Sequence, residues 1–176
     1  MNVESRASGG FDAAVAAFQA PLLRYAARLL NNATLAQDAV QNALVKLTRR
    51  VPPPDGPSDE VRNWLFRVTH NEAVDLIRAE ESRHRTLERF AQQQMCESAE
   101  DAEDEREALV LACLPALPPL QRQVVLLRLQ QGLSYDAIAE IVGEKSGYVG
   151  NLLHRAVKAL ATEVKRREGG SEHVSA

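Results

Sequence analysis

Apolar side chains recur at steps of three and four residues along each regular stretch of this 176-residue chain. That period gathers them on one face of an α-helix, whereas a half-buried β-strand needs alternation every second residue. No segment alternates in that way over a useful length, and aromatic residues, which strands favour, make up only 5% of the chain. The sequence therefore predicts an all-α protein in which each helix buries one face.

Turn-forming residues divide the first half of the chain into three helical blocks. The stretch 51–60 carries four prolines and one glycine, so it cannot be helical. Pro21 falls inside the first block, where it is expected to kink the helix or to start a second segment. Residues 1–10 precede the pattern, and we expect them to form a flexible N-terminus. The helices are predicted over 11–31, 34–50 and 60–80, and the third can extend through the charged residues after it.

The second half carries the start and stop signals of a helix-turn-helix. Prolines at 118 and 119 open one helix, and Ser134 and Gly143 cap the start and the end of the next. A last helix is predicted over 146–164. Two helices pack closely at a steep angle when the first carries a small residue, the turn a glycine and the second an inward-facing apolar residue. This packing leaves the outer face of the second helix free to enter a DNA major groove. Those residues are Ala139, Gly143 and Val149.

The formal net charge of −3 hides an uneven distribution. Residues 96–107 hold seven acidic side chains and one arginine, whereas residues 145–167 hold six basic side chains and one glutamate. A basic stripe on the second helix of a helix-turn-helix suits DNA, because lysine and arginine displace the counterions of the phosphates. We therefore predict that the C-terminal helices bind DNA; a helical hairpin with a solvated charged face is the alternative.

The sequence shows no pattern typical of a catalytic site, a metal site or a membrane-spanning segment. Cys96 and Cys113 do not form a C-x-x-C pair, and the four histidines are scattered without ligand spacing. No apolar run approaches the ~18 residues that a membrane span needs. The N-terminus lacks the basic start and apolar core of a signal peptide. We therefore expect a cytoplasmic protein that is not an enzyme and uses neither a metal nor a cofactor.

Two blocks of residues carry a family pattern, one after the other. AQDAVQNALVKLTR and VRNWLFRVTHNEAVDLIRAEESR form the first, and ALPPLQRQVVLLRLQQGLSYDAIAEIVG followed by LLHRAVKAL forms the second. The first block resembles region 2, and the second region 4, of the extracytoplasmic-function (ECF) sigma factors of the sigma-70 family. A LuxR-type response regulator would explain only the second block. The resemblance implies sigma region 2 over 11–90, an acidic linker over 91–107, sigma region 4 over 108–167 and a tail over 168–176.

An ECF sigma factor is a promoter-specificity subunit, so the resemblance implies that the chain binds core RNA polymerase and directs transcription initiation at promoter DNA. Region 2 would grip the clamp coiled coil of the β′ subunit and read the melted −10 element. Region 4 would sit on the β flap and read the −35 element. The alternative is a sigma-like interaction protein that binds polymerase or an anti-sigma factor without productive promoter recognition. Two departures from typical members motivate it: Gly150 and Leu152 replace basic residues, so that we expect a weak −35 contact, and region 2.2 lacks most of its usual acids.

Melted DNA requires planar groups to stack on bases, amides for base edges and cations for phosphates. The resemblance places Asn71 and the proline-rich loop at the flipped −10 base, where the loop is either a rigid tip or a spacer. Trp64 neighbours apolar Leu65 and Val68, which favours a core tryptophan over a base contact. The candidate −10 residues are Arg62, Asn63, Trp64, Arg67, Asn71, Arg78 and Arg83. The candidate −35 residues are Lys145, Ser146, Tyr148, Asn151, His154, Arg155 and Lys158.

The candidate polymerase-binding residues are Asp38, Gln41 and Asn42. Region 2.2 of typical members is strongly acidic, whereas this chain keeps only Asp38 of the usual acids. The resemblance to subgroups that lack these acids implies threonine phosphorylation as a substitute, with Thr34 and Thr48 as candidate sites and a Ser/Thr kinase as a candidate partner. We favour the alternative that Asp38 and Gln41 suffice.

Overall fold

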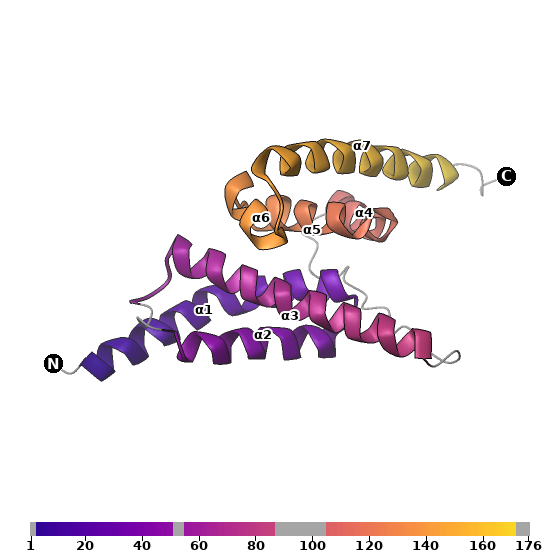
Figure 1. The fold of residues 1–176 in the computed structure, drawn as a ribbon. Coiled ribbons are helices and arrows are strands. Elements are labelled where there is room, and N and C mark those ends of the chain that lie inside the picture. Colours follow the sequence, from indigo (N-terminus) through magenta and orange to yellow (C-terminus); the bar gives the residue numbers. More distant parts are fainter. Residues whose placement is uncertain (1–2, 51–54, 87–104, 172–176) are drawn as a thin grey trace. The chain divides into compact units, whose positions relative to one another are not determined.

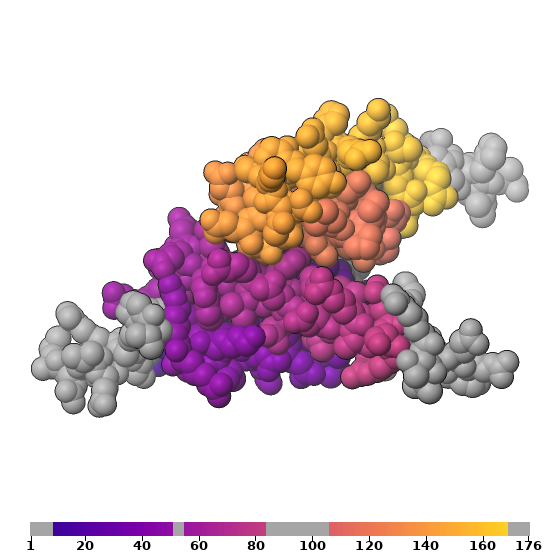
Figure 2. All heavy atoms as spheres, viewed as in Figure 1, coloured from indigo at the N-terminus to yellow at the C-terminus, as the bar shows by residue number. Residues whose placement is uncertain are grey.

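The computed structural model describes residues 3–50, 55–86 and 105–171 of the chain, and within these ranges every regular element is a helix. The chain divides into two compact units, an N-terminal unit over Met1–Cys96 and a C-terminal unit over Glu97–Ala176. The division falls inside the segment that was predicted to be the acidic linker. Figure 1 shows the helices of each unit, and Figure 2 shows that side chains fill the space between neighbouring helices within a unit.

The N-terminal unit is a bundle of three helices, α1 (Val3–Leu30), α2 (Ala33–Thr48) and α3 (Asp59–Thr86), each of which packs against the other two. Its centre is aromatic: the rings of Tyr25 and Phe66 are both fully buried and meet edge to face, with 5.7 Å between their centroids. This arrangement favours contact between the positive ring edge and the negative ring face.

A polar pair lies within the same core. The Tyr25 hydroxyl and Nδ1 of His70 form a hydrogen bond of 2.9 Å, and His70 is only 5% exposed. Burial lowers the pKa of His70 to about 4, and the positive charge of Arg78 contributes to this lowering. The imidazole is therefore neutral near pH 7 and ties α1 to α3.

The C-terminal unit is built around its last helix. Helix α4 (Glu105–Cys113) is followed by a 3₁₀ turn, by α5 (Pro119–Val125) with a π-helical turn over Leu126–Gln130, by α6 (Tyr135–Val142) and by α7 (Ser146–Ser171). Helix α7 packs against α4, α5 and α6. Each of these three helices thereby buries an apolar face against it.

The predicted helix-turn-helix is confirmed in α6 and α7. The Ser134 hydroxyl accepts a hydrogen bond of 3.2 Å from the Ala137 amide and so caps α6. Gly143 ends the helix with a φ of 73°, which a residue without a Cβ adopts at little cost. Ala139 and Val149 are 7% and 0% exposed, so both the small and the apolar residue lie in the core.

Helix boundaries differ from the predictions at both ends of the chain. Helix α1 begins at Val3 rather than at residue 11, so most of the expected flexible N-terminus is helical, and it runs through Pro21 as one element. Packing of fully buried Leu22 and Tyr25 directly after the proline offsets its lost hydrogen bond. Helix α7 continues to Ser171, into the expected tail, because extending a formed helix costs little.

Candidate promoter and polymerase interfaces

Three of the candidate −10 residues share one exposed face of α3. Arg67, Asn71 and Arg78 are four and seven residues apart and are all exposed, so they follow one another along the helix. Arg62 and Arg83 each lie five residues from that series and fall on a different face. Arg62 pairs with Asp59 and Arg83 with Glu80 in the preceding turn.

Trp64 is neither a core residue nor a free ring. It is half-buried, and the guanidinium carbon of Arg50 lies 5.6 Å from the centroid of its ring. This cation–π contact joins the end of α2 to the start of α3. Beside it, Oδ1 of Asn63 is buried and accepts no hydrogen bond from the described residues. The core position favoured for Trp64 is therefore only partly realised, because the ring is half-buried and lies against the Arg50 guanidinium.

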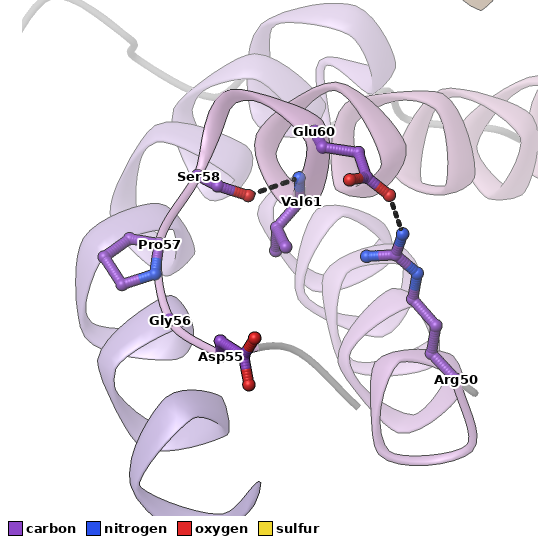
Figure 3. A pocket seen from close by; sticks show the side chains of 7 residues that line it. All are labelled: Arg50, Asp55, Gly56, Pro57, Ser58, Glu60 and Val61. Carbon is purple, nitrogen blue, oxygen red and sulfur yellow. Dashed lines mark hydrogen bonds and ion pairs between the residues drawn. The ribbon is translucent and has the colours of Figure 1, made fainter. Parts of the chain in front are cut away.

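An open cavity of about 410 Å³ lies where the chain enters α3 (Figure 3). The Arg50 guanidinium forms an ion pair with Glu60, and the Ser58 hydroxyl accepts a hydrogen bond of 3.2 Å from the Val61 amide, which fixes the first turn of α3. Residues 51–54 of the proline-rich loop lie outside the described part of the chain. The cavity is lined by Arg50, Asp55, Gly56, Pro57, Ser58, Glu60 and Val61.

The candidate polymerase-binding residues also share one face, on α2. Asp38, Gln41 and Asn42 are exposed, and Val45, which is 49% exposed, continues the series. The Asn42 amide donates a hydrogen bond of 3.0 Å to Glu72 of α3, and the Lys46 ammonium forms an ion pair with the same carboxylate. The structure thus places a second acidic residue, Glu72, against this face.

Both candidate phosphorylation sites are exposed, but their surroundings on α2 differ. Thr34 lies in the first turn of the helix, four residues before Asp38. Thr48 is the last residue, and its hydroxyl donates a hydrogen bond of 2.7 Å to the Val45 carbonyl. A phosphate is stabilised by the positive end of the helix dipole at Thr34 and opposed by the negative end at Thr48.

The exposed face of α7 carries most of the candidate −35 residues. Tyr148, Asn151, Arg155 and Lys158 are exposed at steps of three and four residues, and His154 lies beside them. Lys145 is exposed in the turn before α7, whereas Ser146, the first residue of the helix, is half-buried. The predicted stripe is therefore continuous from the turn to the middle of α7.

Two of the three basic residues near the end of α7 share one carboxylate. Nε of Arg166 and Nε of Arg167 donate hydrogen bonds of 2.9 Å and 3.0 Å to the carboxylate of Glu163. These bonds lower the pKa of Glu163 to about 2, so it stays ionised through the physiological range. Two of the six basic side chains counted over 145–167 thus share one carboxylate, whereas no ion pair of the described residues involves Lys145, Arg155 or Lys158.

Sequence reasoning missed two residues that shape these surfaces. Arg50 lies directly before the prolines, and Glu72 lies 30 residues from Asn42. Neither position in the sequence indicates that Arg50 contacts Trp64 or that Glu72 contacts Asn42. In the described part of the chain, no three histidine, cysteine or acidic side chains gather to hold a metal ion. Cys113 is buried and forms no disulfide, while Cys96 lies outside the described residues.

The helices of the described ranges include none that combines the length and the apolarity needed to cross a membrane.

Comparison with protein-family models matches both halves of the chain. The model of sigma-70 region 2 matches residues 14–83, and the model of sigma-70 region 4 matches residues 103–160. The two matches follow the order that the sequence predicted, and they cover the α1–α3 bundle and the helix-turn-helix unit.

Curated relatives match across both units. The chain is 34% identical over 163 residues to an RNA polymerase sigma-E factor of Streptomyces avermitilis, a match that covers 90% of this chain and 87% of the relative. The sigma-E factor of Streptomyces coelicolor is also 34% identical, over 161 residues, with coverage of 90% and 88%. A probable ECF RNA polymerase sigma factor, SigI of Mycobacterium tuberculosis, is 31% identical over 84% of this chain and 53% of its own length.

Two solved structures share the fold. One is the sigma factor RpoE in complex with the anti-sigma factor NepR from Bartonella quintana, with a TM-score of 0.68, 24% identity and coverage of 82% of this chain and 91% of that one. The other is CnrH in complex with the cytosolic domain of CnrY, with a TM-score of 0.62, 26% identity and coverage of 93% and 94%. With both region models matched in order and relatives at one-third identity across nine-tenths of its length, the chain belongs to the ECF group of the sigma-70 family of RNA polymerase sigma factors.

Proposed function

We propose that the two units divide promoter recognition by this ECF sigma factor. The N-terminal unit reads the −10 element with the exposed face of α3 and the cavity before it, and the C-terminal unit reads the −35 element with α7. The observation that carries the proposal is that each unit presents one continuous series of amide and basic side chains on a single helix. Arg67 and Asn71 form that series on α3, and Asn151, Arg155 and Lys158 form it on α7.

The cavity suits one unstacked base. Its volume of about 410 Å³ falls in the range of small-molecule pockets. Its lining offers the Arg50 guanidinium as a donor and the carboxylates of Asp55 and Glu60 as acceptors, which is the mixture that a base edge needs. Asn71 and Arg67, further along α3, then bind the next base edge and a phosphate.

Core polymerase binds the α2 face in this proposal. Asp38 and Gln41 contact the clamp coiled coil of β′, and Glu72, which pairs with Lys46, holds the Asn42 amide at the same surface. The C-terminal unit sits on the β flap, and the chain works in the cytoplasm with its polymerase. An anti-sigma factor is a further proposed partner, since both structural neighbours were solved in complex with a second protein, which for RpoE is the anti-sigma factor NepR.

Phosphorylation of Thr34, rather than of Thr48, would strengthen polymerase binding. The Thr34 phosphate would extend the acidic surface of Asp38 at the favourable end of the helix dipole. The affinity of Thr34→Asp for core polymerase should exceed that of the wild type and of the matched Thr48→Asp variant. Gln37→Glu adds an acid to the neighbouring exposed position without disturbing the Asn42–Glu72 bond. If none of the three variants binds more tightly, the charge-substitution idea is wrong.

Run-off transcription with core polymerase tests the division of labour. The wild-type chain should produce promoter-specific transcripts; Asn71→Ala should impair promoter opening, and Arg155→Ala should impair binding to duplex upstream DNA. The alternative function, a sigma-like interaction protein, instead predicts tight binding to core polymerase and no specific transcript from any promoter fragment. An unchanged promoter preference in Arg155→Ala would remove that side chain from the −35 assignment.

A further inference from the structure

One carboxylate of α3 joins two residues of α2 that lie one turn apart. Oε2 of Glu72 accepts a hydrogen bond of 3.0 Å from the Asn42 amide, and Oε1 forms an ion pair with the Lys46 ammonium. Residues four apart on a helix share a face, so the carboxylate holds each of them with one oxygen. The Glu72 side chain is 19% exposed, against 56% for Lys46, so Glu72 is a bridge between the helices more than part of the outer surface.

The bond to Glu72 fixes the direction in which the Asn42 amide points. An ionised carboxylate can only accept hydrogen bonds, so the group of Asn42 that faces it must be the NH₂ group. The planar amide carries its carbonyl oxygen on the other branch, and Oδ1 therefore points away from Glu72. Because Asn42 is exposed, this oxygen is presented to a partner as an oriented acceptor.

The oriented acceptor continues the acidic part of the α2 face. Asp38 precedes Asn42 by four residues, so the two side chains are neighbours along the helix. Glu72 also holds the Lys46 ammonium, which would otherwise oppose the approach of a cation to this face. One carboxylate thus directs an acceptor outward and offsets a positive charge beside it.

We propose that Glu72 is a positioning residue for polymerase binding: by holding the amide nitrogen of Asn42, it turns Oδ1 toward a cationic side chain of core RNA polymerase. This inference rests on the proposed binding of core polymerase by the α2 face. Glu72 acts through Asn42 and needs no polymerase contact of its own. Asn42 then serves as a neutral acceptor, and a carboxylate cannot replace it while Glu72 stands opposite.

Competition for core polymerase tests this role. Unlabelled variants of the full chain displace labelled wild-type chain from core RNA polymerase, and the melting temperature of each variant is measured in parallel. Glu72→Ala should bind about fivefold more weakly, because the acceptor is no longer oriented. Glu81→Ala removes an exposed carboxylate from the same helix and should bind like the wild type.

Exchanging donor and acceptor gives the sharpest comparison. Asn42→Asp sets two carboxylates opposite each other, so it should also weaken binding about fivefold, although it adds a negative charge to the face. In Asn42→Asp/Glu72→Gln, the amide at position 72 donates to the new carboxylate, and its oxygen still accepts from Lys46. This double variant has the net charge of the wild type and should bind at least as tightly.

A bridge that only packs α2 against α3 predicts a different pattern. Lys46→Met breaks the other half of the bridge, and under the proposal it binds no more weakly than the wild type. Equal losses of affinity and of melting temperature in Lys46→Met and Glu72→Ala would overturn the proposal. Tighter binding by Asn42→Asp alone would also overturn it, since charge and not orientation would then decide the affinity.

Asp38→Ala separates this inference from the function on which it rests. If Asp38→Ala loses affinity while Glu72→Ala and Asn42→Asp retain it, polymerase binding by α2 stands and the role of Glu72 falls. If all three bind like the wild type, both fall. Should Glu72→Ala fail to fold, as circular dichroism would show, the comparison of Asn42→Asp with the double variant decides in its place.

Discussion

The two units use their charged side chains in different ways. In the N-terminal unit, two ion pairs join separate elements, Lys46 of α2 with Glu72 of α3 and Arg50 with Glu60 across the loop, while the other described pairs lie within α3. In the C-terminal unit, the described ion pairs gather on Glu163 near the end of α7, and Arg155 and Lys158 stay outside them. A paired cation releases fewer counterions than a free one, so duplex binding by the C-terminal unit should depend more steeply on salt.

The difference matches the DNA that each unit is proposed to bind. Melted DNA offers unstacked bases, and the cavity beside the Arg50–Glu60 pair suits them. Duplex DNA offers two rows of phosphates, and unpaired basic residues on an exposed helix face suit those. Four changes, taken from the largest expected effect to the smallest, test whether each unit unfolds independently of the other.

Phe66→Ala should have the largest effect, and only on the N-terminal unit. The side chain is fully buried and meets Tyr25 edge to face, so its loss should cost about 3–5 kcal/mol of unfolding free energy. Heat denaturation followed by circular dichroism and by proteolysis of each unit should show the C-terminal unit unaffected. A loss of the same size in both units would mean that they unfold together.

Acid should destabilise the N-terminal unit through His70. The unfolded chain binds a proton at this residue near pH 6.5, whereas the folded chain does so only near pH 4. The contribution of His70 to stability is therefore complete above pH 6.5 and is lost by about 3 kcal/mol as the pH falls to 4. Urea denaturation between pH 7 and 4 measures this loss, and His70→Gln should flatten the curve. In the described part of the C-terminal unit no histidine is buried, so its transition should lack this component.

Helix caps offer a matched pair of smaller changes, one in each unit. Ser134→Ala removes the bond to the Ala137 amide in the C-terminal unit, and Asn32→Ala removes a bond of 3.1 Å to the Leu35 amide in the N-terminal unit. Each should cost about 1 kcal/mol, in its own unit alone. Ser134→Ala should also weaken duplex binding, because α6 supports α7, while Asn32→Ala should not. Equal effects of the two variants on DNA binding would contradict the assignment of −35 contacts to the C-terminal unit.

Replacing two helical glycines should have the smallest effect, and unlike the preceding changes it should stabilise the protein. A Cβ on Gly150 of α7 would lie in ordinary contact with Tyr135, and a Cβ on Gly9 of α1 would meet nothing within 4 Å. Alanine at either position should therefore stabilise its unit by up to about 1 kcal/mol. Thermal melting checks both variants. Destabilisation by Gly150→Ala alone would show that the Tyr135 ring is held against α7 more tightly than the distance implies.

Local sequence signals predicted the helices, whereas packing between helices explains where the observed helices differ from the prediction. Ser134 and Gly143 act within one turn of the chain, so their positions predict the bounds of α6. Pro21 misled the prediction because its cost is local, while the burial of Leu22 and Tyr25 that offsets it comes from packing against other helices. The start of α1 at Val3 was missed because the residues before Phe11 show no apolar period.

For the candidate surfaces, too, the arrangement of residues along one helix was predictable, whereas contacts between helices were not. Steps of three and four residues are enough to place Asn71 with Arg67 on one helix face and Asn151 with Arg155 on another. The contacts of Trp64 with Arg50 and of Asn42 with Glu72 were not predictable, because each joins two helices whose relative rotation is set by the core.

The sequence by itself determined the all-helical class, the two matched regions and the residues exposed along each helix, since these follow from periodicity and from motifs within one segment. Tertiary structure alone decided which charges are paired, which ring is covered and where a cavity opens. Lys46 of α2 reaches its carboxylate partner, Glu72 of α3, only because the core sets how these two helices lie against each other. The physical reason is that an electrostatic contact depends on distances between particular side chains, which the packing of the helices sets.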